Sequence, residues 1–160
     1  MRLSRTVAAA AVTGLMVLSG QAASAISWGT VYLKDSYGNN LGSGYGSAYK
    51  AIVNGGDALK VTSQQRDLHA NGNAIYTKAQ WYFNGTFCYP SGEGTVGCTS
   101  GWYGDGSTSS PTTASYTSVW LAKALKGTAN SARAGIMVCE KQPWYDPDDC
   151  TWENYRGISY

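Results

Sequence analysis

The sequence predicts an all-β fold, and three observations lead to this prediction. The chain has 6 Trp, 12 Tyr and 2 Phe, all of them after residue 25. Aromatic, Thr and Val residues suit the pleated, half-buried surface of a sheet, and the 20 Gly together with many Ser supply turns. Several short segments alternate between apolar and polar residues, and no heptad or internal repeat is present. We therefore expect a small antiparallel β-sandwich-like domain with two local disulfides and long Gly/Ser-rich loops.

The first predicted strand covers residues 26–34, where alternate side chains point to opposite faces. Residues 35–47 are rich in Gly, Ser and Asn, and this composition predicts a flexible connector. Short strands are expected at residues 48–53 and 58–64. The turn cluster Asn54-Gly55-Gly56-Asp57 separates them.

The clearest strand pattern covers residues 74–83, and alternate residues there share one apolar face. Asn84-Gly85 follows at once and predicts a tight hairpin turn, with residues 86–89 returning beside the strand. Asn84-Gly85-Thr86 also spells a glycosylation acceptor, but a hairpin accounts for it without a glycan. The expected buried face comprises Ile75, Thr77, Ala79, Trp81 and Phe83.

The rest of the chain alternates between loop and strand patterns. Residues 91–115 predict a long loop with a short strand around Trp102-Tyr103. Residues 116–126 fit either a strand or a helix, and their β-branched and aromatic first half favours the strand. Residues 132–141 predict a strand that carries Cys139, and the tail after Cys150 is expected to pack back on the domain.

Four cysteines predict a disulfide framework in an exported chain, although four cysteines allow three connectivities. Local pairing is favoured because turn residues lie between the members of each pair. A zinc site is disfavoured, since there is no Cys-x-x-Cys and the sole histidine is His69. No metal or cofactor is expected. The favoured pairs are Cys88–Cys98 and Cys139–Cys150.

The N-terminus has the pattern of a cleavable signal peptide over residues 1–25. Arg2 and Arg5 precede an apolar run, and Ala23-Ser24-Ala25 supplies a cleavage site. The apolar run is too short for a transmembrane helix, so we expect a secreted, extracellular protein without a membrane span. Its mature form would comprise a strand with a flexible segment, residues 26–47, and a disulfide-stabilised β domain, residues 48–160.

Charge gives no sign of a nucleic-acid partner. The chain has 12 Lys+Arg and 10 Asp+Glu, and loss of Arg2 and Arg5 with the signal would leave ten of each. The remaining basic residues are scattered along the sequence, whereas nucleic-acid-binding proteins concentrate them on one face or in one stretch. The sequence therefore disfavours binding to nucleic acid.

No pattern of catalytic residues stands out. His69 near Asp67 could act as a base, but its place between strands predicts an exposed turn residue. There is no Gly-x-Ser-x-Gly elbow, and a carboxylate pair would have to come from Glu93, Glu140, Glu153 and the aspartates. The cluster Asp146, Asp148 and Asp149 lacks the spacing of a calcium loop. We expect a protein that is not an enzyme.

Aromatic residues among Gly, Ser and Asn give the one functional signal of the composition. Tyr and Trp provide large contact areas at low entropic cost and are enriched at recognition surfaces. The alternative is that these rings pack on the small core. The residues in question are Tyr37, Tyr45, Tyr49, Trp102, Tyr103 and Trp144.

Two stretches, GNAIYTKAQWYFNG and RAGIMVCEKQPWYDPDDC, together with the Ala-Ser-Ala signal end, resemble small secreted proteins of actinobacteria. Among these, the chain is similar to the small adaptor subunit of umbrella toxin particles. The resemblance implies a non-enzymatic part that links a toxin-bearing chain to a lectin-like subunit. It also implies that an extended segment at the mature N-terminus, here Ile26 to about Leu41, straps into the partner.

The sequence thus favours a secreted binding or adaptor protein whose partners are other secreted proteins. Carbohydrate is a conceivable partner without support in the sequence. One alternative is a cell-wall or glycan hydrolase that uses His69 or a carboxylate pair, and another is a protease inhibitor that presents the Cys88–Cys98 loop. The expected partner-binding residues are Trp28, Val31, Tyr32, Leu33, Tyr37 and Tyr45.

Overall fold

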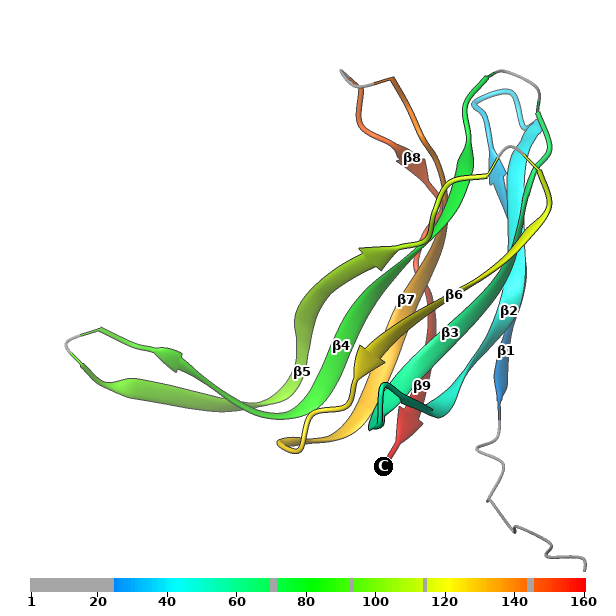
Figure 1. Cartoon of the computed structure of the whole chain (residues 1–160). Helices are drawn as coiled ribbons and strands as arrows, with labels where there is room; N and C mark the ends of the chain where they lie inside the picture. The colour runs from blue at the N-terminus through cyan, green and yellow to red at the C-terminus, as the bar shows by residue number, and fades with distance from the viewer. Residues whose placement is uncertain (1–24, 70–71, 93, 114, 144–145) are drawn as a thin grey trace, which may run out of the picture.

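Two antiparallel sheets pack face to face in a β-sandwich (Figure 1). The computed structural model describes residues 25–69, 72–92, 94–113, 115–143 and 146–160, and these residues contain no helix. The predicted all-β class is therefore confirmed for the described part of the chain. Residues 1–24 of the predicted signal peptide lie outside that part. The strands are β1 (Ile26–Lys34), β2 (Asn40–Val53), β3 (Gly56–Asp67), β4 (Ile75–Pro90), β5 (Val96–Ser109), β6 (Thr117–Ala124), β7 (Ala129–Glu140), β8 (Asp149–Cys150) and β9 (Asn154–Ser159).

The chain crosses between the sheets three times. Strands β1, β2 and β3 form a meander in the first sheet, and β4 and β5 form a hairpin in the second. The chain then returns to add β6 beside β3, and crosses again to add β7 beside β4. Both short C-terminal strands, β8 and β9, pair with β7. The first sheet has the order β1-β2-β3-β6, and the second has β5-β4-β7 followed by β8 and β9.

The core lies between the two sheets and draws side chains from both. Strand β4 contributes every second residue, as the alternation predicts, and all five members of its expected buried face are at most 1% exposed. Trp28 of β1 and Leu59 and Val61 of β3 cover them from the other sheet. Burying such apolar side chains contributes about 1.5–3 kcal/mol each.

A buried polar network also joins the sheets. Gln65 of β3 is fully buried, and its Oε1 accepts hydrogen bonds from the Thr77 backbone N–H (3.1 Å) and the Ser110 hydroxyl (2.8 Å). Its Nε2 donates to the Pro111 carbonyl at 2.9 Å. The Ser63 and Thr77 hydroxyls complete the network at 2.7 Å. Each polar group of the Gln65 side chain is thereby satisfied, as burial requires.

Segment 35–47 differs from the expected flexible connector. Only a turn at 35–39 separates β1 from β2, which begins at Asn40 and pairs with β1 on one side and β3 on the other. The glycines in this strand permit close approach of the sheets. A Cβ on Gly42 would lie 2.5 Å from the Ile75 side chain, and one on Gly44 would lie 2.9 Å from Val138. These glycines serve packing, so their frequency misled the prediction of flexibility.

The hairpin expected at Asn84-Gly85 is absent, because β4 continues through these residues to Pro90. The register between β4 and β7 shifts at this point, and a Cβ on Gly85 would collide with the Thr128 carbonyl. Gly85 thus permits a bulge and a close backbone approach. The two-residue Asn-Gly turn occurs instead at Asn54-Gly55, with φ values of 51° and 80°, between the paired Val53 and Gly56.

Most of the predicted 91–115 loop is strand. β5 begins at Val96 and pairs with β4 over most of its length. The ambiguous segment 116–126 forms strand β6, which confirms the favoured reading. The expected strand around Cys139 is confirmed as β7, and the tail returns as β9. No helix in the described part of the chain is long and apolar enough to cross a membrane.

Both local disulfides are confirmed, and each joins two residues that face one another across adjacent strands. Cys88 of β4 is bonded to Cys98 of β5, and Cys139 of β7 is bonded to Cys150 of β8. In the chain-entropy model, closing loops of this size stabilises a fold by about 3 kcal/mol each. The first disulfide braces a hairpin, and the second holds the C-terminal segment on β7.

Candidate functional site: the projecting arm

The predicted partner-binding residues divide into a buried and an exposed group. Trp28 and Leu33 are 2% and 5% exposed and belong to the core, and Val31 packs against it. The Trp28 indole N–H donates to the Thr62 carbonyl at 3.0 Å. Tyr32, Tyr37 and Tyr45 are exposed. The strand of residues 26–34 is therefore an integral part of the first sheet.

Part of the outer edge of β1 is already covered by β9. The Asn154 amide donates to the Trp28 carbonyl at 2.7 Å, and Arg156 Nε donates to the Ser27 carbonyl at 2.8 Å. These contacts satisfy backbone carbonyls that an added strand from a partner would otherwise use. The N-terminal end of β1 is thus tied to the body of the protein.

The other predicted aromatic residues lie at separate places on the sandwich. The Tyr45 and Tyr116 hydroxyls lie 3.1 Å apart on the outer face of the first sheet. Tyr37 lies in the turn after β1, Tyr49 is half-buried on β2, and Trp144 lies outside the described residues. Tyr45 and Tyr49 share β2, whereas Trp102 and Tyr103 share β5, at the root of a feature that the sequence did not reveal.

This feature is the far half of the β4–β5 hairpin, from Thr86 to Ser100, which we call the arm. Strand β7 pairs with β4 as far as Gly85, and beyond this point β4 and β5 pair only with each other. Figure 1 shows the arm leaving the sandwich and projecting well beyond both sheets. All of its described residues are exposed except Phe87 and Gly97, which are intermediate.

A stripe of aromatic rings leads from the core onto the arm. Phe83 is buried in the sandwich, and its ring centroid lies 6.2 Å from that of Tyr103. Tyr103 lies 4.8 Å from Phe87, and Phe87 lies 6.0 Å from Tyr89. These rings occupy the same face of the hairpin because they stand at alternate positions or opposite one another. The face that meets the opposite sheet inside the sandwich is uncovered on the arm.

The arm is braced against collapse. Cys88–Cys98 ties its two strands together, and the Tyr89 ring covers Gly97, where a Cβ would lie 3.2 Å from the ring. At the tip, the Ser91 N–H donates to the Thr95 carbonyl at 3.0 Å. An isolated two-stranded ribbon is only marginally stable in water, so these contacts give the arm the order that it needs.

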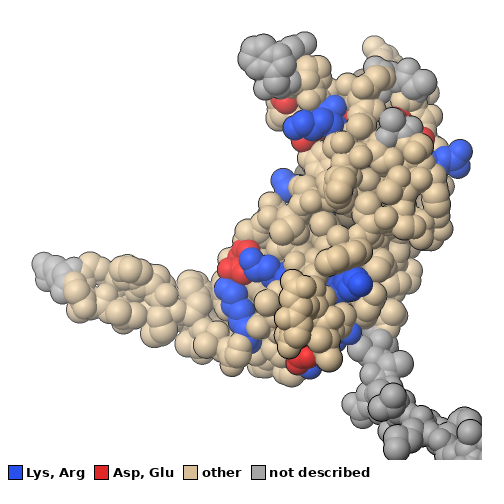
Figure 2. All heavy atoms as spheres, viewed as in Figure 1, with Lys and Arg blue, Asp and Glu red and all other residues tan. Residues whose placement is uncertain are grey.

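Charges are absent from the described residues of the arm. Between residues 84 and 104 the only charged residue is Glu93, which lies outside the described residues. In Figure 2 the described part of the arm carries no acidic or basic colour, whereas charges gather at its root. There Asp105 pairs with Lys123 (2.9 Å) and Lys126 (2.6 Å). Burial alone would raise the pKa of Asp105, but the two ammonium groups lower it overall.

The described candidates for catalysis each have local hydrogen-bond partners. His69 is exposed, and its backbone N–H donates to Asp67 at 3.0 Å. Glu140 is buried and accepts a hydrogen bond from the Gln142 amide at 2.8 Å. The carboxylate of Asp148 accepts from the Tyr76 hydroxyl (2.7 Å) and the Gln142 N–H (3.0 Å), so it links Gln142 to β4. Within the described residues, no group of three metal-binding side chains comes together.

Sequence reasoning missed the arm because Asn84-Gly85 resembles a turn. The signal that could have found it is the alternation that continues past this dipeptide, with Phe83, Phe87 and Tyr89 on one face. No protein-family model, curated protein or solved structure matches the chain. Its function has to be inferred from its own surface, on which the arm is the most distinctive feature.

Proposed function

We propose that this protein is an exported, non-enzymatic binding or adaptor module that docks onto a partner protein through the arm. The observation that carries this proposal is the aromatic stripe of Tyr103, Phe87 and Tyr89, which continues the core-facing surface beyond the end of the opposite sheet. An apolar surface without a covering layer is typical of protein–protein contacts. The two disulfides are compatible with an extracellular location.

The chemistry of the arm indicates what the partner surface must be like. Tyr and Phe rings contribute much contact area and lose little side-chain entropy on binding. Because the described residues of the arm carry no charge, they gain nothing from a nucleic acid or an anionic surface. The partner would offer an apolar cleft or an apolar strand edge, against which the free edges of the ribbon can form backbone hydrogen bonds.

A narrower form of the proposal is that the module links subunits of an antibacterial toxin particle through its mature N-terminal segment. The sequence resemblance supports this form. The partner would use the part of the β1 edge beyond Ser27 and Trp28, whose carbonyls are already occupied by Arg156 and Asn154. In this case Tyr32, which is 50% exposed, would contact the partner, while Trp28 and Leu33 would stay in the core. The arm would then be available for a second subunit, as a linker requires.

Replacing the arm's aromatic residues is expected to abolish partner capture. The double variant Phe87→Ser/Tyr89→Ser removes the apolar stripe outside the sandwich, and loss of two aromatic contacts should weaken binding by at least about tenfold. The measurement is quantitative pull-down of the tagged protein, in its exported form, from its own culture supernatant. The matched control is Ile52→Ser/Trp152→Ser, since these residues are 77% and 95% exposed and lie outside both the arm and the N-terminal segment.

Thermal melts of both double variants test whether the sandwich is intact. The proposal would be contradicted if the arm variant captured the partner as well as the wild type does. It would also be contradicted if the control variant lost as much partner capture as the arm variant. Flotation with neutral lipid vesicles provides a further check. If the arm variant loses vesicle binding and no protein partner is found, the arm is a lipid-binding element and the adaptor function is wrong.

A further inference from the structure

Arg133 occupies an unusual position on the outer face of the second sheet. Its guanidinium carbon lies 4.2 Å from the ring centroid of Trp102, 4.7 Å from that of Tyr155 and 5.2 Å from that of Tyr82. The three rings come from three different strands: β4 and β9 flank β7, and β5 lies beyond β4. Contacts of this kind attract the cation to the ring faces and fix the plane of the guanidinium. We call Arg133 and these three rings the arginine cage.

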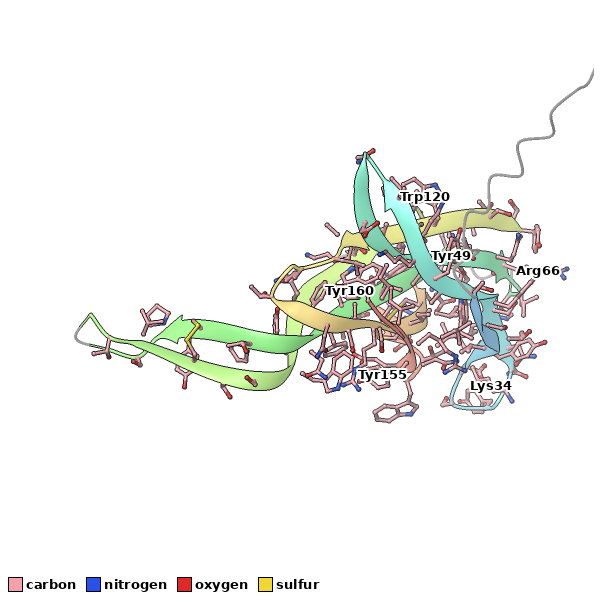
Figure 3. The ribbon with its side chains drawn as sticks, turned by 90° about the horizontal axis from the view of Figure 1, so that it is seen from below. Lys34, Tyr49, Arg66, Trp120, Tyr155 and Tyr160 are labelled. Atoms are coloured by element: carbon pink, nitrogen blue, oxygen red, sulfur yellow. A yellow bond between two sulfur atoms is a disulfide. The ribbon has the colours of Figure 1, made fainter. Side chains whose placement is uncertain are left out.

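The register of the sheet creates the cage. Tyr82 stands directly opposite Arg133, and Gly157 stands opposite it on the other side. A Cβ on Gly157 would lie 2.8 Å from the Arg133 Cβ, so the glycine leaves the space that the arginine side chain fills. Tyr155 precedes Gly157 by two residues on β9, so it lies diagonally across from Arg133 and its ring contacts the guanidinium. In Figure 3, Tyr155 lies on the side of the sandwich opposite Trp120.

The guanidinium of Arg133 has unused binding capacity. Its Nε is buried without a hydrogen-bond partner, and the described residues provide no ion pair to Arg133. The nearby Glu153 is engaged elsewhere, since it accepts hydrogen bonds from the Tyr82 hydroxyl at 2.9 and 3.1 Å. Burial, together with Tyr155 and Glu153, raises the pKa of Tyr82, so its hydroxyl stays protonated and keeps Glu153 occupied.

A shallow depression of about 230 Å³ opens beside the cage. A second arginine, Arg156, reaches it, and its Nε and Nη1 donate to the Ser27 and Tyr155 carbonyls. The described residues give Arg156 no carboxylate partner either. The depression therefore combines two cations, two hydroxyls and two partly exposed rings. Its lining includes Trp102, Ser131, Arg133, Tyr155, Arg156 and Ser159.

We propose that this depression binds a carboxylate-bearing sugar residue of the uronic acid type. Arg133 would form charge-assisted hydrogen bonds with the carboxylate, because its planar guanidinium matches that group. The exposed ring faces of Trp102 (43% exposed) and Tyr155 (45%) would stack on the C–H face of the sugar. The depression is shallow and open, which suits a sugar ring lying on an exposed aromatic side chain better than the side chains of an acidic peptide. This site is separate from the arm and does not depend on partner docking.

Isothermal titration calorimetry on the full-length protein tests the proposal with tetragalacturonate as the probe. Its methyl ester keeps the sugar and removes the charge, and tetraglutamate keeps the charge and removes the sugar. We expect tetragalacturonate to bind and the other two to bind at least about tenfold more weakly, since a hydrogen bond to a charged group accounts for that factor or more. Raising the salt concentration should weaken the binding.

Variants locate the site. Arg133→Gln and Trp102→Ala should each reduce tetragalacturonate affinity at least about tenfold. Arg133→Lys should fail to restore it, because lysine lacks the planar fork. Arg66→Gln, a matched change at an exposed arginine elsewhere, should bind as the wild type does. Absence of binding at millimolar probe, equal binding of the methyl ester or of tetraglutamate, or full affinity in both Arg133→Gln and Trp102→Ala would overturn the proposal. Far-UV circular dichroism confirms that each variant is folded.

Discussion

Trp28→Ala is expected to lower the free energy of unfolding by about 3–5 kcal/mol, the range for removing a large aromatic side chain from a core. Trp28 is 2% exposed, packs between the sheets, and donates its indole N–H to the Thr62 carbonyl. The alanine variant would lose the packing and leave that carbonyl without its side-chain donor. Urea denaturation followed by intrinsic fluorescence measures the loss.

The matched control is Tyr32→Ala, because Tyr32 lies on the same strand and is 50% exposed. A surface change of this kind should alter stability by about 0.5 kcal/mol or less. Equal, small effects of the two substitutions would show that β1 is not part of the core. The expected difference also affects the interpretation of truncations, since removing residues 26–41 would remove Trp28, Leu33 and Leu41 together. A protein truncated in this way would unfold, and any loss of partner binding would then follow from the unfolding.

Gln65→Leu is expected to lower the free energy of unfolding by about 2–4 kcal/mol, although leucine has a similar size and is apolar. The substitution removes the Gln65 donor to the Pro111 carbonyl, which keeps only the hydrogen bond from the Ser110 hydroxyl. It also removes the buried acceptor that the Ser110 hydroxyl and the Thr77 backbone N–H and hydroxyl share. Each buried polar group left unsatisfied costs about 1–3 kcal/mol. The shared network adds to this loss, because its members also bond one another.

The adjacent residue offers a close control. Gln64→Leu changes the same side chain one position earlier on β3, where Gln64 faces outward and bonds the exposed Ser118 hydroxyl. It should change the free energy of unfolding by about 0.5 kcal/mol or less. Urea denaturation of the two variants side by side gives the comparison. If Gln65→Leu were as stable as Gln64→Leu, the polar network would contribute nothing to joining the sheets.

The strands and their faces followed from the sequence wherever an alternating pattern was strong. Residues 75–83 show this best, because period two assigned each side chain of β4 to its correct face. The glycines of β2 were harder to interpret. Gly42 and Gly44 are needed for contact with Ile75 and Val138, which are distant in sequence, and no local pattern reveals such contacts. Tertiary packing therefore overrode the local signal for flexibility.

The arm and the arginine cage depend on the register between strands that are remote in sequence. Local pairing of Cys88 with Cys98 was predictable, since turn residues lie between them. The length of the hairpin was not predictable. Gly85 lies at a bulge, close to the Thr128 backbone, and this contact exists only in the folded sheet. The cage brings Tyr82, Trp102 and Tyr155 around Arg133 from separate strands. A single sequence contains no signal for that arrangement.

The central claim is that the arm holds the partner, and removal of the arm tests it most directly. Residues 86–100 can be replaced by Asn-Gly between Gly85 and Gly101, which face one another in the hairpin. The measurement is size-exclusion chromatography of culture supernatant, with the protein detected by a C-terminal tag. We predict that the wild type elutes in a complex and that the armless variant elutes as a folded monomer with nearly unchanged melting temperature. Co-elution of the folded armless variant with the same partner would contradict the proposed function.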